Sequence, residues 1–70
     1  MIGFHTEAAA LDKAVELSAA KLGNYFSVIV GWPGVGPFCA VVVRGSPTVV
    51  EHGQRLAWRC INGRSFPVEG

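Results

Sequence analysis

The sequence is poor in charge and in cysteine, and both shortages narrow the class of protein. Only 16% of the 70 residues are charged and the net charge is +1, so no strong electrostatic field attracts nucleic acid or a membrane surface. Two cysteines, Cys39 and Cys60, are too few for a disulfide-rich secreted scaffold. The first residues also lack the basic start of a signal peptide. We therefore expect a cytoplasmic protein with free thiols.

The longest stretch without charge lies between Lys21 and Arg44, and it is long enough to span a bilayer as a helix. Glycines and prolines interrupt its middle, at residues 31–37. The backbone groups that they free would have no hydrogen-bond partners in lipid. We therefore expect no insertion into a membrane.

The sequence also lacks a catalytic motif. The glycine-rich loop Gly31–Pro37 is followed by Phe38-Cys39, where a phosphate-binding loop requires Lys-Ser or Lys-Thr and the start of a helix. Glu51-His52 is the one place where a carboxylate adjoins a histidine, and adjacent residues in a turn rarely converge on one point. We expect no enzymatic activity and no cofactor.

Residues of the types that bind zinc are present, but they are scattered. They form no C-x-x-C or H-x-x-x-H pair, so each ligand would have to arrive alone. These residues are His5, Cys39, His52 and Cys60. We expect no metal site, and we expect both cysteines to be buried thiols on the core face of the fold.

The N-terminal third of the chain predicts a helix over residues 6–22. Thr6 is a good N-cap residue, and the residues after it are rich in strong helix formers. Gly23 or Asn24 supplies the stop. The apolar stripe at helical spacing comprises Leu11, Ala14, Val15, Ser18 and Leu22.

The rest of the chain predicts strands, because it is rich in β-branched and aromatic residues. Asn62-Gly63 is typical of a two-residue type I′ hairpin loop, and Pro67 places the last strand at a sheet edge because it has no N–H to donate. We expect a single α+β domain, in which one N-terminal helix packs on a four- to five-stranded antiparallel meander sheet. The expected strands are Tyr25–Val30, Phe38–Arg44, Thr48–Val50, Arg55–Ile61 and Arg64–Val68.

Alternation along the strands predicts which side chains share a face. It groups Leu56, Trp58 and Cys60 on the face toward the helix, and Arg55 with Arg59 on the opposite face. With an Asn-Gly loop, Arg59 lies opposite Phe66, where a cation–π contact is expected.

The two strands before residue 45 are apolar on both faces, and one helix covers only one of them. Ile29, Phe38 and Val42 are expected near water, with Tyr25 as a further candidate. Burying each such side chain is worth about 1.5–3 kcal/mol, so several exposed ones would forgo much of the stability of a small domain. We expect a second copy or another protein to cover this face, unless the sheet curls closed on itself.

These patterns favour a small non-enzymatic protein-binding module, with a homodimer as one form of that binding. The alternative is a small nucleic-acid-binding domain that uses an arginine and aromatic sheet face. In size and layout the chain resembles small inhibitors encoded by phages and mobile elements, including anti-CRISPR proteins, which dock on a larger host protein. The candidate partner-binding residues are Trp32, Val35, Phe38, Arg44, Arg55, Arg59 and Phe66.

Overall fold

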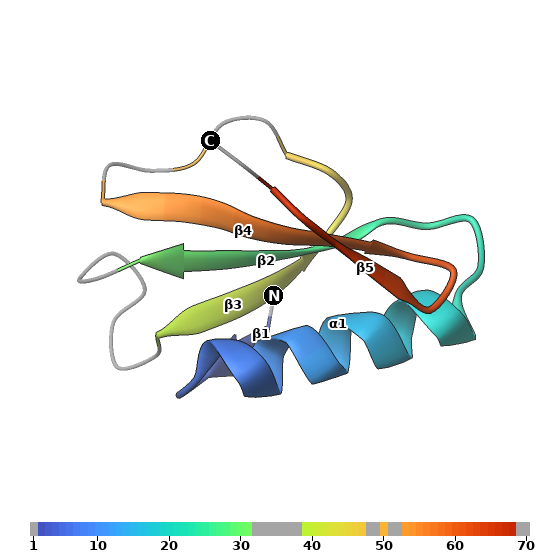
Figure 1. Cartoon of the computed structure of the whole chain (residues 1–70), viewed down its shortest axis with the longest axis horizontal. Helices are drawn as coiled ribbons and strands as arrows, with labels where there is room; N and C mark the ends of the chain where they lie inside the picture. Colours follow the sequence, from blue (N-terminus) through green and yellow to red (C-terminus); the bar gives the residue numbers. More distant parts are fainter. Residues whose placement is uncertain (1, 32–38, 48–49, 51–52, 69–70) are drawn as a thin grey trace.

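The computed structural model describes residues 2–31, 39–47, 50 and 53–68 (Figure 1). Helix α1 packs on one face of a five-stranded sheet whose neighbouring strands are all antiparallel. The predicted α+β fold, with an N-terminal helix on an antiparallel sheet, is therefore confirmed. In chain order the elements are β1 (Ile2–Phe4), α1 (Glu7–Ala20), β2 (Phe26–Gly31), β3 (Ala40–Arg44), β4 (Gln54–Ile61) and β5 (Arg64–Pro67).

Local signals determine where α1 begins and ends. The Thr6 side chain accepts a hydrogen bond from the Ala9 N–H at 3.1 Å, which confirms the predicted N-cap. The helix ends at Ala20, two residues before the predicted limit, and Gly23 follows with a φ of +84°. Because the helix ends early, Leu22 does not join the apolar stripe and is 70% exposed.

The face of α1 that meets the sheet is lined by small residues. Ala10, Ala14 and Ser18 are fully buried and recur every four residues. Their size allows the helix backbone to approach the sheet closely, while Leu11, Val15 and Leu17 pack around them. The sheet residues of this core are Phe26, Val28, Ala40, Val42 and Cys60.

The strand order, β1-β3-β2-β4-β5, contains a crossover that a simple meander lacks. Strands β3 and β4 lie on either side of β2 and are both antiparallel to it, so they run parallel to each other. The chain must therefore return along the length of the sheet between them. Figure 1 shows the described part of this connection on the side of the sheet away from α1. Val50 lies in no strand; Thr48 and Val49, the rest of the strand expected there, lie outside the described residues.

The prediction that Ile29 and Val42 remain near water is wrong. Val42 pairs with Val28 on the helix face and is 2% exposed. Ile29 does face away from α1, but it is only 8% exposed, and its neighbour Val41 is also buried. The centre of the outer sheet face is thus buried, on the side where the described part of the β3–β4 connection lies. Phe38, the third residue of that prediction, lies outside the described residues.

A β-bulge in β4 changes the face of every residue before it. Val28 pairs with Trp58, whereas the next residue, Ile29, pairs with Leu56, so Ala57 is an extra residue. Leu56 therefore lies on the outer face, not on the helix face as predicted. Arg55 pairs with Val30 and lies on the helix face, so the expected grouping of Arg55 with Arg59 on one face is also wrong.

The hairpin between β4 and β5 is joined to the end of the helix. Asn62 and Gly63 have φ values of 54° and 79°, which confirms the predicted left-handed two-residue turn. The Gly63 N–H donates to the Ser18 hydroxyl at 3.0 Å, and the Gly23 N–H donates to Asn62 Oδ1 at 2.9 Å. A Cβ at Gly63 would lie 3.3 Å from the Ala19 Cβ, so this close approach favours glycine. The order also places β5 at an edge, as Pro67 predicts.

Within the described part of the chain, no helix is long and apolar enough to cross a bilayer. The uncharged stretch after Lys21 is instead occupied in part by strands β2 and β3.

Replacing Ser18 with alanine should destabilise the fold, because the partly buried Gly63 N–H loses its acceptor. Leaving such an N–H unpaired costs about 1 kcal/mol or more, which exceeds the roughly 0.5 kcal/mol that alanine gains in helix propensity. Ser65→Ala is the matched control: Ser65 is exposed on β5, and its loss should change the unfolding free energy by no more than about 0.5 kcal/mol. Urea denaturation followed by circular dichroism measures both, and equal midpoints for the two variants would contradict the role of Ser18.

Candidate functional site

The structure describes the positions of four of the seven predicted partner-binding residues, whose role stays a prediction. Trp32, Val35 and Phe38 lie outside the described residues, so the role of their loop stays a prediction. Arg44, Arg55, Arg59 and Phe66 are described, and only two of them lie opposite each other.

Arg59 and Phe66 form that pair. They are opposite each other on β4 and β5, in the register that the Asn-Gly loop predicts. Ser27 pairs with Arg59 from the other side, so all three residues share the sheet face away from α1. Phe66 is 48% exposed. The register is confirmed, whereas the cation–π contact between the two side chains stays a prediction.

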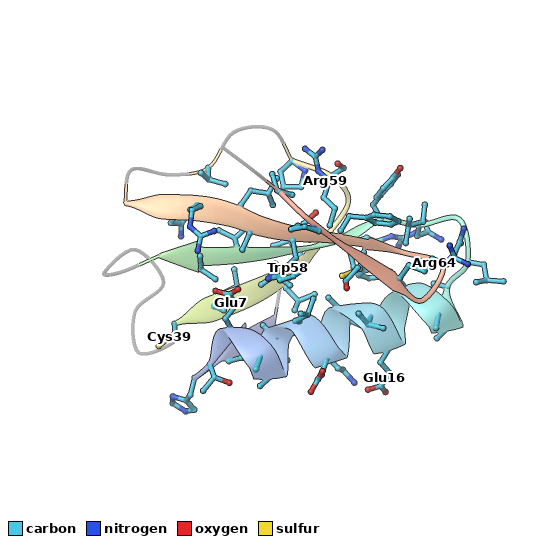
Figure 2. All side chains as sticks on the ribbon, in the orientation of Figure 1. Glu7, Glu16, Cys39, Trp58, Arg59 and Arg64 are labelled. Atoms are coloured by element: carbon cyan, nitrogen blue, oxygen red, sulfur yellow. The ribbon has the colours of Figure 1, made fainter. Side chains whose placement is uncertain are left out.

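The Arg59 guanidinium carries an unusual constraint. Its Nε atom is buried and has no hydrogen-bond partner among the described residues. A buried N–H on a charged group is costly to leave unpaired. Arg59 is thus held against the sheet by packing, on the side away from the helix (Figure 2).

Arg55 belongs to a different group of side chains, on the helix face of the sheet. Its Nη2 atom lies 3.9 Å from Glu7 Oε1, and the Trp58 indole N–H donates to Glu7 Oε2 at 2.8 Å. Figure 2 shows Glu7 and Trp58 between α1 and the sheet. These contacts join the first turn of the helix to β4, so Arg55 has a structural role here. Alternation alone missed this group because the bulge at Ala57 reverses the face of Arg55.

Arg44 lies at the end of β3, near the C-terminal end of α1. Its Nη2 atom donates to Asn24 Oδ1 at 3.1 Å, and the Asn24 N–H donates to the Lys21 carbonyl at 3.2 Å. This arrangement places Arg44 beside Lys21, rather than beside Arg59 in one row across the sheet.

Three more residues extend the Arg59 and Phe66 pair. Ile61 lies two residues beyond Arg59 on the same face, and Arg64 is its partner on β5. Tyr25 lies two residues before Ser27, receives a hydrogen bond at its carbonyl from the Gly45 N–H at 2.7 Å, and is 44% exposed. The outer-face patch is defined here as Tyr25, Arg59, Ile61, Arg64 and Phe66.

Alternation along β4 and the register of the Asn-Gly turn together predict that Ile61 and Arg64 lie on the same face as Arg59. Both follow from the register that placed Arg59 opposite Phe66, although neither was among the predicted partner-binding residues. Tyr25 was already a candidate for exposure on the face away from the helix, and its 44% exposure confirms that expectation.

The described residues offer little for covalent or metal chemistry. They contain no group of three or more metal-binding side chains. Cys39 and Cys60 are both free, but Cys39 is exposed, which contradicts its predicted place on the core face. Cys60 is buried as predicted, and burial raises the pKa of its thiol above the ordinary 9.0. Glu51 and His52 lie outside the described residues.

The two thiols should react at very different rates in the folded protein. Because a thiolate is the reactive form, the raised pKa and burial of Cys60 both protect it, whereas Cys39 is open to reagent. Titration with a chromogenic disulfide reagent near pH 8 should detect one fast thiol without denaturant and a second only after unfolding. Cys39→Ser should remove the fast phase alone, and a fast phase surviving in that variant would contradict the assignment.

Comparison with known proteins identifies no relative. No protein-family model, no curated protein and no solved structure matches this chain.

Proposed function

We propose that this chain is a non-enzymatic protein-binding module that docks through the outer-face patch. The observation that carries the proposal is the pairing of half-exposed Phe66 with Arg59, with Tyr25 and Ile61 in the next row. Aromatic residues and arginine are the residue types that most often carry the binding energy of protein interfaces. The patch offers both on a regular sheet, which holds them in place before binding.

This basis for docking differs from the one that the apolar strands predicted. The centre of the outer face, at Ile29 and Val41, is buried in the chain itself and is unavailable to a partner. The patch lies further along the sheet, where β4 and β5 approach their turn, and its half-exposed side chains are the ones a partner would cover.

Docking through side chains fits this sheet better than addition of a strand to its edge. In an antiparallel pair, alternate residues point their backbone groups toward the neighbouring strand. The Val68 N–H donates to the Ala57 carbonyl at 2.9 Å, so the groups that point outward along β5 belong to Ser65 and Pro67. Pro67 has no N–H, so Ser65 is the one outward-pointing backbone donor of β5. This shortage of donors disfavours the pairing of another strand with this edge.

Replacing Phe66 with alanine should abolish most partner binding. Truncation of an aromatic hot-spot residue costs about 2 kcal/mol or more, or roughly thirtyfold in affinity. Phe66 is exposed, so its loss should leave the fold intact by circular dichroism. The measurement is a lysate pull-down in which the wild-type chain recovers a stoichiometric protein and Phe66→Ala does not.

Arg55→Ala is the control for that experiment, because Arg55 is outside the patch and should leave recovery unchanged. Failure of the wild-type chain to recover a protein at any salt concentration would contradict the proposed function. A homodimer would appear instead as a mass that falls on dilution in light scattering.

Nucleic-acid binding is the second candidate, and the Arg59 and Phe66 pair is again the observation that favours it. Sheet-face aromatics beside arginine can stack with bases. This function predicts an affinity that falls steeply with salt and with Arg59→Ala, and a flat titration at low salt would exclude it.

A further inference from the structure

The charges of the described residues are divided between the elements of the fold, with the acidic ones on the helix. The described carboxylates, those of Glu7, Asp12 and Glu16, all lie on α1. Two of them form ion pairs, Glu7 with Arg55 and Glu16 with Lys13. Figure 2 shows Glu7 at the opposite end of the molecule from Arg64, and Glu16 pointing away from the sheet.

The remaining described cations pair with none of the described carboxylates. Arg64 lies at the end away from Glu7, and Arg59 lies nearer the middle (Figure 2). Lys21, Arg44, Arg59 and Arg64 take part in neither of the two ion pairs that the described residues form. Hydrogen bonds show that their elements converge. The Asn62 turn bonds to Gly23 at the end of the helix, and Arg44 bonds to Asn24.

Exposed apolar side chains accompany these cations. Leu22, at 70% exposure, lies between Lys21 and Gly23, and Tyr25 and Phe66 are nearly half exposed. Three of the four large apolar residues exposed in the described part of the chain are thus at this end. The basic end is defined here as Lys21, Leu22 and Arg44, and it is continuous with the outer-face patch.

We propose that the basic end and the outer-face patch together bind an acidic segment of a partner protein. This inference rests on the proposed function and specifies the chemistry of the partner. Carboxylates of that segment would meet Lys21, Arg44 and Arg64, and its apolar side chains would cover Leu22, Tyr25 and Phe66. Arg59 already has its Nε atom removed from water, so less of its hydration is lost when a carboxylate reaches the outer nitrogens of its guanidinium.

A second copy of this chain is a poor occupant for the same surface. Most homodimers are built around a two-fold axis, which places the same patch of both subunits in contact. Such a contact would bring the cations of one patch, Lys21, Arg44 and Arg64, toward the cations of the other, and like charges brought together cost affinity.

A nucleic acid is disfavoured by the apolar side chain that accompanies the cations at this end. Leu22 is aliphatic and exposed, so it offers no stacking surface for a base but suits an apolar side chain of a protein. The net charge of +1 adds little long-range attraction.

The test uses the full chain, labelled with nitrogen-15, and three probes at low salt. The probes are a short peptide of Glu and Phe residues, the same peptide with Gln in place of Glu, and an oligothymidylate of similar length. The acidic peptide should shift the amide signals of Gly23, Tyr25, Ile61 and Phe66, and its affinity should fall as salt is added. The Gln peptide and the oligothymidylate should bind at least tenfold more weakly, by roughly the contribution of two or more charge pairs.

Charge removal locates the site. Arg64→Gln should weaken the acidic peptide by about two- to fivefold, and adding Lys21→Gln should weaken it further by a similar factor. Arg55→Gln, which removes one positive charge at the other end of the molecule, should change the affinity by less than about twofold.

Four other outcomes would each overturn the inference, and each would identify a different alternative. Equal binding of the Gln peptide would show apolar docking alone and leave the proposed function standing. Tighter binding of the oligothymidylate than of the acidic peptide would overturn the inference and the proposed protein-binding function, and would indicate nucleic-acid binding. A mass above the monomer that falls on dilution would identify a second copy as the occupant. No shift with the acidic peptide at low salt would remove the inference, while the lysate experiment decides the proposed function separately.

Discussion

One fourteen-residue helix can cover only one face of a five-stranded sheet, and this constraint organises the molecule. The helix face is filled by Val28, Val42 and Cys60 beneath the small residues of α1. The opposite face also carries apolar side chains, among them Ile29 and Val41, which would be unfavourable in water. Both are nevertheless buried, on the side of the sheet where the described part of the β3–β4 connection lies. The large apolar side chains that remain exposed on this face, Tyr25 and Phe66, lie toward the β4–β5 turn.

The polar contacts differ between the two ends of the molecule. At the start of α1, the Glu7 carboxylate forms an ion pair with Arg55 and accepts a hydrogen bond from the Trp58 indole, which links the helix to the sheet. At the other end, the helix terminus, the end of β3 and the β4–β5 turn converge through Ser18, Asn62 and Asn24. Apart from the Arg44 guanidinium, these contacts use neutral groups, and no described carboxylate pairs with the nearby arginines. Within the described part of the chain, cations thus lie beside exposed apolar residues at this end.

Features decided by neighbouring residues could be read from the sequence with good accuracy. The Thr6 cap, the glycine that follows α1 and the Asn62-Gly63 turn each depend on a few consecutive residues. The turn in turn sets the register that places Arg59 opposite Phe66, so this half of the candidate site was predictable. Arg55 was misplaced because one extra residue, Ala57, reverses the alternation that the prediction assumed. Val42 and Cys39 were misplaced because nothing local shows which face of β3 meets the helix.

The sequence by itself determined the fold class, the limits of the helix to within two residues, the one tight hairpin and the edge position of β5. Each follows from propensity, capping or a missing N–H, which act over a few residues. Only the tertiary structure decided the strand order, the bulge at Ala57, the face of each apolar residue in β3, and the pairing of β2 with β4 that brings Tyr25 close to Arg59 and Phe66. Those depend on contacts between residues far apart in the chain, whose pairing is chosen by the packing of the whole sheet against one helix and one crossover.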